Sequence, residues 1–176
     1  MRTLFVLAAV ASMALPAAAL ERGGDGYYHT GDAVRVKKVA FIKIKVYSIE
    51  HAMKDLPPAK SKQAVIDADV DKRFSWKMLR TVDAEKIRNA LREAYEMNGY
   101  GDGAKVKAFV QALAAKELKE GDAVTIRYDA AKKSTTITSP AGSATVGGED
   151  FMKATWKIWF GKIDQPDLGD HLIDRF

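Results

Sequence analysis

The stretch VRVKKVAFIKIKVY, residues 34–47, alternates apolar and polar side chains with a period of two. Ile42, Ile44 and Val46 fall on one face of an extended chain, and Tyr47 falls on the other face together with two lysines. This periodicity is typical of a strand with one buried face. We therefore expect a half-buried strand here.

Arg35 and Tyr47 lie at the two ends of this stretch with matching strand parity. A straight strand would separate them by roughly 40 Å. They can share a site only if the chain turns back between them. We expect that turn at about residues 37–40, which would divide the stretch into two antiparallel strands.

The flanking segments predict an irregular arm and a further strand. Residues 20–32 contain four glycines and no apolar period, which indicates an arm without regular structure. After the Pro57-Pro58 break, apolar residues alternate with aspartates, which predicts a strand over residues 64–79.

Helical spacing takes over in the middle of the chain. Asp83 fits the N-cap of a helix whose Ile87, Leu91 and Tyr95 share a face, and Gly99 ends that helix. A second helix is expected over residues 104–116.

The C-terminal part returns to strands and then to helix. Gly147-Gly148 precedes a helix that carries Trp156 and Trp159. Strands followed by helices, and then strands again, predict an α+β fold with an antiparallel sheet and helices packed on one face. The remaining expected elements are strands over residues 124–128, 135–138 and 144–146, and a short helix over residues 168–176.

The composition excludes several classes of function. The 176 residues include 28 Lys plus Arg, 23 Asp plus Glu and no Cys. Without Cys there is no disulfide framework, thiolate metal site or Cys nucleophile. The lysine cluster between residues 37 and 45 is explained by a solvated strand face, and we expect no nucleic-acid partner.

Residues 1–19 have the pattern of a secretory signal peptide. A basic start is followed by an apolar stretch, Pro16 and an alanine triplet, and the uncharged run from Thr3 to Leu20 is 18 residues long. We expect cleavage after Ala19, an uncleaved anchor being the alternative. One domain, residues 20–176, would then be periplasmic or secreted, with no integral membrane segment.

The sequence contains no motif that matches a known metal or cofactor site. Asp67, Asp69 and Asp71 have the opening spacing of a calcium loop, but that loop needs Gly and Glu where this chain has Lys72 and Met78. We interpret the aspartates as outward carboxylates on a sheet edge, and we expect no cofactor and no metal. The histidines lie far apart, at His29, His51 and His171.

Arg35, Tyr47 and Tyr100 remain as a candidate anion site. A guanidinium and two phenols can hold a carboxylate or phenolate. The alternative is that Arg35 is one more exposed base and that the tyrosines pack in the sheet. The residues alone leave both readings open.

Several short motifs follow one another over about residues 30–174. They are residues 35–53, Tyr100-Gly101-Asp102, Glu120-Gly121-Asp122, Gly148-Glu149-Asp150-Phe151 and Ile158-Trp159-Phe160-Gly161. In this order they resemble the chalcone isomerase family, above all its bacterial exported members. In plant enzymes of that family an Arg holds the substrate phenolate, while a Thr and a Tyr polarise the ketone. Other plant members bind fatty acids without catalysis.

The resemblance assigns roles residue by residue. Arg35 matches the family arginine and Tyr100 the family tyrosine, whereas Tyr47 stands where the enzymes have the Thr. Lys107 and Ile158 replace two further polar pocket residues. The resemblance thus implies that anion-binding groups are retained and that ketone-polarising groups are lost.

Three hypotheses follow from these residues. The first is a periplasmic, non-catalytic binding protein for a small amphipathic anion such as a fatty acid, with Arg35, Tyr47, Tyr100, Lys107 and Ile158 lining the site. The second is an isomerase or intramolecular lyase of the same fold acting on an unidentified substrate. The third is a protein whose Trp156 and Trp159 face another chain, the alternative being that both tryptophans pack in the core; no protein partner can be named.

Overall fold

The computed structural model describes residues 20–176. The predicted signal peptide, residues 1–19, lies outside the described residues. In the described range no helix is both long and apolar enough to cross a membrane.

Within residues 20–176 the fold is built on one antiparallel sheet of six strands. These strands pair in the order β1-β2-β3-β6-β7-β8, so β1 and β8 are the edges. Their bounds are β1 (Tyr28–Val39), β2 (Ile42–Met53), β3 (Lys72–Met78), β6 (Ala123–Asp129), β7 (Ser134–Ser139) and β8 (Gly142–Gly147).

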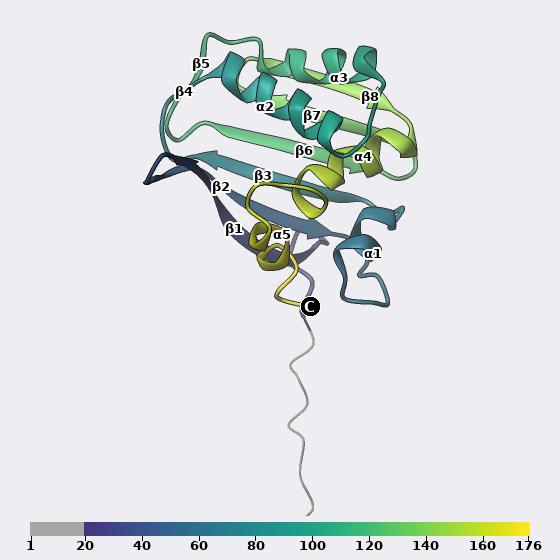
Figure 1. Cartoon of the computed structure of the whole chain (residues 1–176). Coiled ribbons are helices and arrows are strands. Elements are labelled where there is room, and N and C mark those ends of the chain that lie inside the picture. The colour runs from purple at the N-terminus through teal and green to yellow at the C-terminus, as the bar shows by residue number, and fades with distance from the viewer. Residues whose placement is uncertain (1–19) are drawn as a thin grey trace, which may run out of the picture.

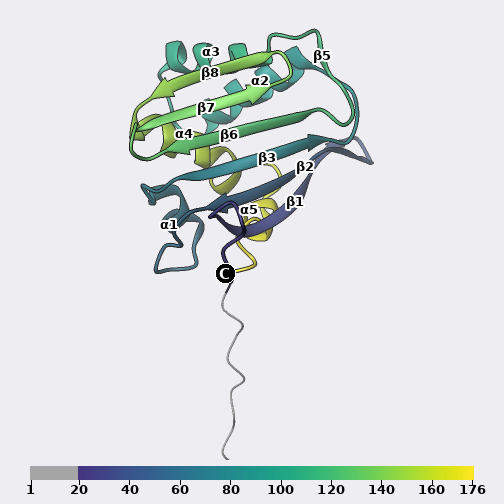
Figure 2. The same cartoon turned by 180° about the vertical axis from the view of Figure 1, so that it is seen from behind.

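Helices cover one face of this sheet, as Figure 1 shows, and Figure 2 shows the opposite face without them. The predicted α+β architecture is therefore confirmed. Two short strands, β4 (Val82–Asp83) and β5 (Glu117–Leu118), form a separate pair. The helices are α1 (Lys62–Asp67), α2 (Ala84–Met97), α3 (Gly103–Val110), α4 (Glu149–Phe160) and α5 (Asp167–His171), with a 3-10 turn at Gln111–Leu113.

The predicted turn between Arg35 and Tyr47 lies at Ala40 and Phe41. Val39 pairs with Ile42 across it, and Arg35 pairs directly with Tyr47. Because opposite residues of paired strands point to the same face, both side chains are on the helix-covered face.

A β-bulge corrects the predicted faces of β2. Arg35 pairs with Tyr47 but the next residue of β1 pairs with Lys45, so Val46 has no partner on β1. Such an extra residue shifts the side-chain alternation by one. The prediction that Tyr47 points away from Val46 is therefore wrong, since the two line one cavity.

The strand predicted over residues 64–79 is only half present. Ser61 caps α1 by accepting a hydrogen bond from the Ala64 amide at 3.1 Å. The buried Lys72 ammonium donates to the last carbonyls of this helix, those of Val65 at 2.7 Å and Ile66 at 3.1 Å. Burial lowers the pKa of Lys72 to about 7. The residues before Lys72 that alternate with a period of two form the end of α1 and a loop, and β3 begins only at Lys72.

The three predicted carboxylates do not lie on a sheet edge, for the same reason, although Asp67 and Asp69 are exposed as predicted. Asp67 is the last residue of α1. Asp69 accepts from the Tyr128 hydroxyl at 2.7 Å, and Asp71 accepts from the Ala130 amide at 2.9 Å. These two carboxylates fasten the loop before β3 to the end of β6.

Three further boundaries differ from the prediction, and one of them is at the last helix, where α5 ends at His171 and does not reach Phe176. The glycine-containing arm, predicted to be irregular, already pairs as β1 from Tyr28 onward. A bulge at Thr30 interrupts the alternation there, so the sequence shows no apolar period. The helix predicted over residues 104–116 ends as α helix at Val110, and Glu117 then pairs in β5.

The core is centred on the aromatic face of α4. Trp156 and Trp159 are buried among Phe74, Trp76 and other rings of the sheet. The hypothesis that the two tryptophans face another chain is therefore wrong.

A buried chain of hydrogen bonds links α4 to the sheet through His51. The Trp156 indole donates to His51 Nε2 at 2.9 Å, so the imidazole proton is on Nδ1. Nδ1 donates to Thr30 Oγ1 at 2.6 Å, and that hydroxyl donates to the Leu172 carbonyl at 2.8 Å. Burial, and then the nearby Lys72 and His29, lower the pKa of His51 well below its usual value.

This histidine predicts a pH-dependent stability. The unfolded chain binds a proton at His51 below about pH 6.5 while the folded chain does not, so the free energy of unfolding falls as the pH falls. The contribution approaches about 1.4 kcal/mol per pH unit at a pH well below 6.5. In urea unfolding between pH 5 and 6.5, the slope should be steeper in wild type and in His171→Gln than in His51→Gln. An unchanged slope in His51→Gln would contradict the assignment.

Candidate functional site

A cavity of about 550 Å³ lies between α2, the β1–β3 part of the sheet and the end of α4. That volume is within the range of small-molecule sites. Its inner wall is mainly apolar, and basic and acidic side chains gather at its rim. The apolar wall includes Ile44, Val46, Ile87, Leu91, Ile158 and Trp159.

Tyr47 forms part of the polar end of this cavity. Its ring stacks on Trp76, with 4.8 Å between centroids, and its hydroxyl accepts a hydrogen bond from the Trp159 indole at 3.1 Å. Burial raises the pKa of the phenol, against the opposing effects of Trp159 and Arg35. Tyr47 therefore stays a neutral phenol whose O–H can donate to a ligand.

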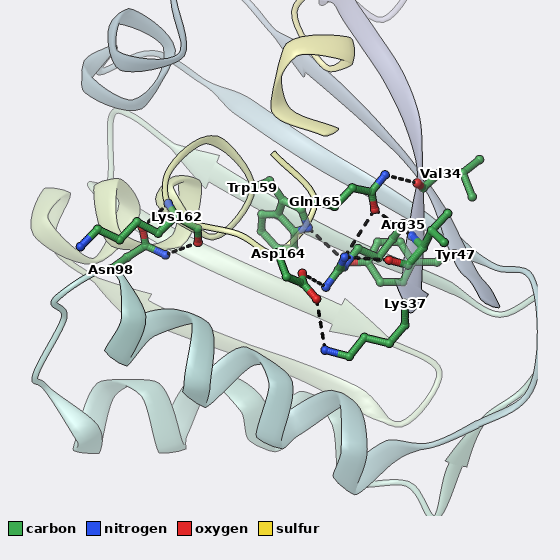
Figure 3. A network of polar contacts seen from close by, with 10 residues as sticks. Val34, Arg35, Lys37, Tyr47, Asn98, Trp159, Lys162, Asp164 and Gln165 are labelled. Atoms are coloured by element: carbon green, nitrogen blue, oxygen red, sulfur yellow. Dashed lines mark hydrogen bonds and ion pairs between the residues drawn. The ribbon is translucent and has the colours of Figure 1, made fainter. Parts of the chain in front are cut away.

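Arg35 lies beside Tyr47 and is held by the segment that follows α4. Its side chain is only 15% exposed. The guanidinium pairs with Asp164 and also donates to the Val36 carbonyl at 3.0 Å (Figure 3). The predicted adjacency of Arg35 and Tyr47 is therefore present in the fold.

Asp164 joins two cations at the rim. Lys37 Nζ lies 3.2 Å from Asp164 Oδ2, and Arg35 contacts the other carboxylate oxygen. Partial burial works to raise the pKa of Asp164, but Arg35 and Lys37 outweigh it and lower the pKa. Asp164 is thus an anion at neutral pH that occupies one side of the guanidinium.

Gln165 fixes this segment to the edge strand β1. Its side-chain oxygen accepts from the Val36 amide at 2.8 Å, and its amide nitrogen donates to the Val34 carbonyl at 3.0 Å (Figure 3). The side chain thus replaces a neighbouring strand at this point of the sheet edge.

The charges around the cavity favour an anion. Five basic side chains and three acidic ones line it. The basic groups beyond Arg35 and Lys37 come from the β3–β4 turn, from α2 and from the segment after α4; they are Arg80, Lys86 and Lys162.

Of the five predicted site residues, three share the cavity and two do not. Arg35, Tyr47 and Ile158 line it. The predicted convergence of Tyr100 is wrong: its hydroxyl donates to Asp150 at 3.1 Å, and its ring packs against Tyr95 and Phe151. Gly99, with φ of 78°, turns the chain after α2 and directs Tyr100 to that side.

Lys107 is also outside the cavity. It is exposed on α3, which packs against β8 and the 3-10 turn rather than against β1 and β2. The spacing between Tyr100 and Lys107 in the sequence does not indicate on which side of α2 these two residues lie.

Several residues of the site were missed. Asp164 and Gln165 come from an irregular segment between two helices. Such a segment has no periodicity from which the direction of a side chain can be predicted. A usable signal existed in α2, because Ala90 and Ala94 lie one turn apart beside Ile87 and Leu91. Small residues on an apolar helix face leave room for a ligand.

The comparisons with known proteins place the chain in a family. The sequence model described as chalcone isomerase-like matches residues 9–168. The chain belongs to the chalcone isomerase-like family. No curated protein is significantly similar in sequence.

A solved structure with the same fold is a fatty-acid binding protein of Arabidopsis thaliana. It superposes with a TM-score of 0.69, covers 86% of this chain and 88% of its own, and is 13% identical. At that identity the likeness shows the chalcone isomerase-like fold and nothing finer.

Among residues 20–176 no group of three or more His, Asp or Glu side chains is arranged to hold a metal ion. His51 is buried in the core, whereas His29 and His171 have neighbouring aspartates. The side chains that line the cavity offer guanidinium groups, a phenol, lysines, three carboxylates and apolar groups.

The role of Gln165 can be tested by hydrogen exchange. Gln165→Ala removes the acceptor of the Val36 amide, a bond that contributes about 1 kcal/mol. Exchange at Val36 should accelerate by up to about tenfold in NMR measurements. Gln63→Ala, which changes an exposed glutamine on α1, should leave Val36 protected. Unchanged exchange at Val36 in Gln165→Ala would mean that another group protects this amide.

Proposed function

We propose that this protein is a non-catalytic binding protein for a small amphipathic anion, such as a fatty acid. The observation that carries the proposal is the apolar cavity with Arg35 and Tyr47 together at one end. An alkyl chain in this cavity gains about 0.8 kcal/mol for each buried CH₂ group. The paired cation and phenol supply donors for a carboxylate.

Asp164 sets the condition for binding. A ligand carboxylate must either displace Asp164 from Arg35 or share the guanidinium and Lys37 with it. Because Asp164 is 46% exposed, it can move into water at a small cost in free energy. The ligand carboxylate would then replace the Asp164 carboxylate at Arg35. The free-energy cost of this exchange depends on the charge of the ligand.

The isomerase hypothesis has less support from this arrangement. A catalytic reading requires donors aimed at a developing oxyanion, and loss of one typically lowers the rate by about 10² to 10³. Tyr100, which the resemblance offers as such a donor, points to Asp150 outside the cavity. Tyr47 and Ile158 stand where the enzymes have polar pocket groups. Binding without chemistry therefore fits the residues better.

The proposal includes export to the periplasm, which rests on the pattern of residues 1–19 alone. Mass spectrometry of the protein from fractionated cells, with the mature chain starting at Leu20, would support it. A cytoplasmic protein retaining Met1 or Arg2 would oppose it.

Arg35→Gln tests the polar end. Loss of a charge-assisted hydrogen bond should weaken binding of oleate by about tenfold to a hundredfold. Binding of oleyl alcohol, which carries no charge, should change little. Isothermal titration calorimetry measures both, and Lys107→Gln supplies the same charge change outside the cavity.

Equal losses for oleate and the alcohol would show that Arg35 acts on the fold rather than on the anion. Native mass spectrometry of the purified protein identifies any lipid that it carries. If neither oleate nor a co-purifying lipid binds, the proposed function is wrong.

Asp164→Asn tests the competition for Arg35. Removing the negative charge frees the guanidinium, so oleate should bind about tenfold more tightly. The alcohol should bind as before. Asp150→Asn, an acidic residue outside the cavity, serves as the matched control. Weaker oleate binding in Asp164→Asn would mean that Asp164 positions Arg35 for the ligand instead of competing with it.

A further inference from the structure

The closed end of the β1–β2 hairpin exposes a group of large apolar side chains. Val39 is 53% exposed, Phe41 is fully exposed and Ile42 is 66% exposed. Elsewhere among residues 20–176 the exposed large apolar residues are only Leu79 and Met97. In Figures 1 and 2 this end projects beyond the neighbouring strands.

The backbone of the turn holds these side chains outward. Val39 and Ile42 still pair across it, so the ladder continues to the last residue before the turn. Ala40 has φ of 52°, a left-handed conformation that costs an L residue free energy. Phe41 contributes nothing to the core, because its ring has no buried surface. The tip is therefore an ordered display of apolar groups rather than a part of the packing.

Basic residues flank this apolar tip in the sequence, and that stretch contains no acidic residue. Residues 33–49 contain one Arg, four Lys and no Asp or Glu. Arg35 and Lys37 pair with Asp164. In the part of the chain that the structure describes, no ion pair involves the other lysines, which are Lys38, Lys43 and Lys45.

Protection of the sheet edge explains only part of this pattern. Lysines on the edge strand β1 oppose pairing with another chain. They do not explain a fully exposed Phe41 between two apolar neighbours, which increases the tendency to associate. The combination of apolar tip and basic flanks is instead that of a segment that lies in a membrane interface, with rings at the acyl boundary and lysines at headgroup level.

We propose that the tip of the β1–β2 hairpin docks on a bilayer of anionic phospholipid. Phe41, Val39 and Ile42 enter the interface, and the three unpaired lysines contact the phosphate groups. A second copy of this chain fits less well, because it would bring one lysine cluster against another. The proposal goes beyond ligand binding in the cavity and does not depend on it.

The position of the tip gives the docking a consequence. Lys37 and Ile44 lie on the same hairpin and also line the cavity. Docking would therefore place the polar rim of the cavity next to the headgroups, where amphipathic anions are concentrated.

Vesicle co-sedimentation tests the proposal. The protein should bind vesicles of phosphatidylcholine with phosphatidylglycerol, bind pure phosphatidylcholine at least about tenfold more weakly, and dissociate as the salt concentration rises. Phe41→Ser and the double variant Lys38→Gln/Lys43→Gln should each weaken binding by about tenfold. Lys107→Gln/Lys132→Gln has the same charge change away from the hairpin and should bind as wild type. All variants have the same residues 1–19, so any vesicle binding by that segment is the same in every protein compared.

A spectroscopic variant reports where the tip goes. The three native tryptophans are buried, so Phe41→Trp adds one exposed fluorophore. Its emission should shift to the blue and be quenched by brominated lipid when anionic vesicles are added. Oleate affinity in Phe41→Ser should be unchanged, which separates failure of docking from failure of the cavity.

Three results would overturn the proposal. One is equal vesicle binding by Phe41→Ser and wild type. Another is a Phe41→Trp emission that does not respond to anionic vesicles. The last is a dimer that forms without vesicles and is abolished by Phe41→Ser, which would assign the tip to a second copy of the chain.

Discussion

The extra residue in β2 is the constraint on which the site depends. Because Val46 has no partner on β1, the alternation of β2 shifts there, and Tyr47 joins Val46 on the helix-covered face. Without the bulge, the stretch from Tyr47 to Met53 would present its other side chains to the core. The buried Ile49, His51 and Met53 all follow the shifted alternation. One irregularity thus sets both the register of the core and the position of the phenol beside Arg35.

Helix α4 connects that sheet to the polar groups of the cavity. Trp159 donates to the Tyr47 hydroxyl, and one turn earlier Trp156 donates to His51. These two bonds satisfy indoles that would otherwise be buried without partners. The segment after α4 then returns to β1, where Asp164 meets Arg35 and Gln165 meets the strand edge. The polar end of the cavity is therefore built from two segments far apart in the sequence, β1 and the segment after α4.

The arrangement favours reversible binding over chemistry. A neutral phenol and a guanidinium that already has a carboxylate partner can accept and release an anion without a large change in the fold. In the function proposed above, the apolar wall would supply most of the affinity and the exchange with Asp164 would adjust it. A hairpin tip that combines apolar and basic residues lies next to the same rim. Cavity and tip together suit a protein that takes an amphipathic anion at a membrane surface and holds it away from water.

The sequence by itself determined the class of fold, the hairpin turn between Arg35 and Tyr47, the cap of α2 at Asp83 and the family. These follow from local periodicity, capping chemistry and short motifs, which act over a few residues. Only the tertiary structure decided that residues 64–67 are helical, that Tyr100 and Lys107 lie outside the cavity, and that Asp164 and Gln165 belong to it. The physical reason is that these features depend on contacts between distant segments: Lys72 with the carbonyls of α1, Tyr100 with Asp150, and the segment after α4 with the edge of β1. A local sequence pattern cannot predict such contacts, because the groups that a side chain meets come from segments far away in the sequence.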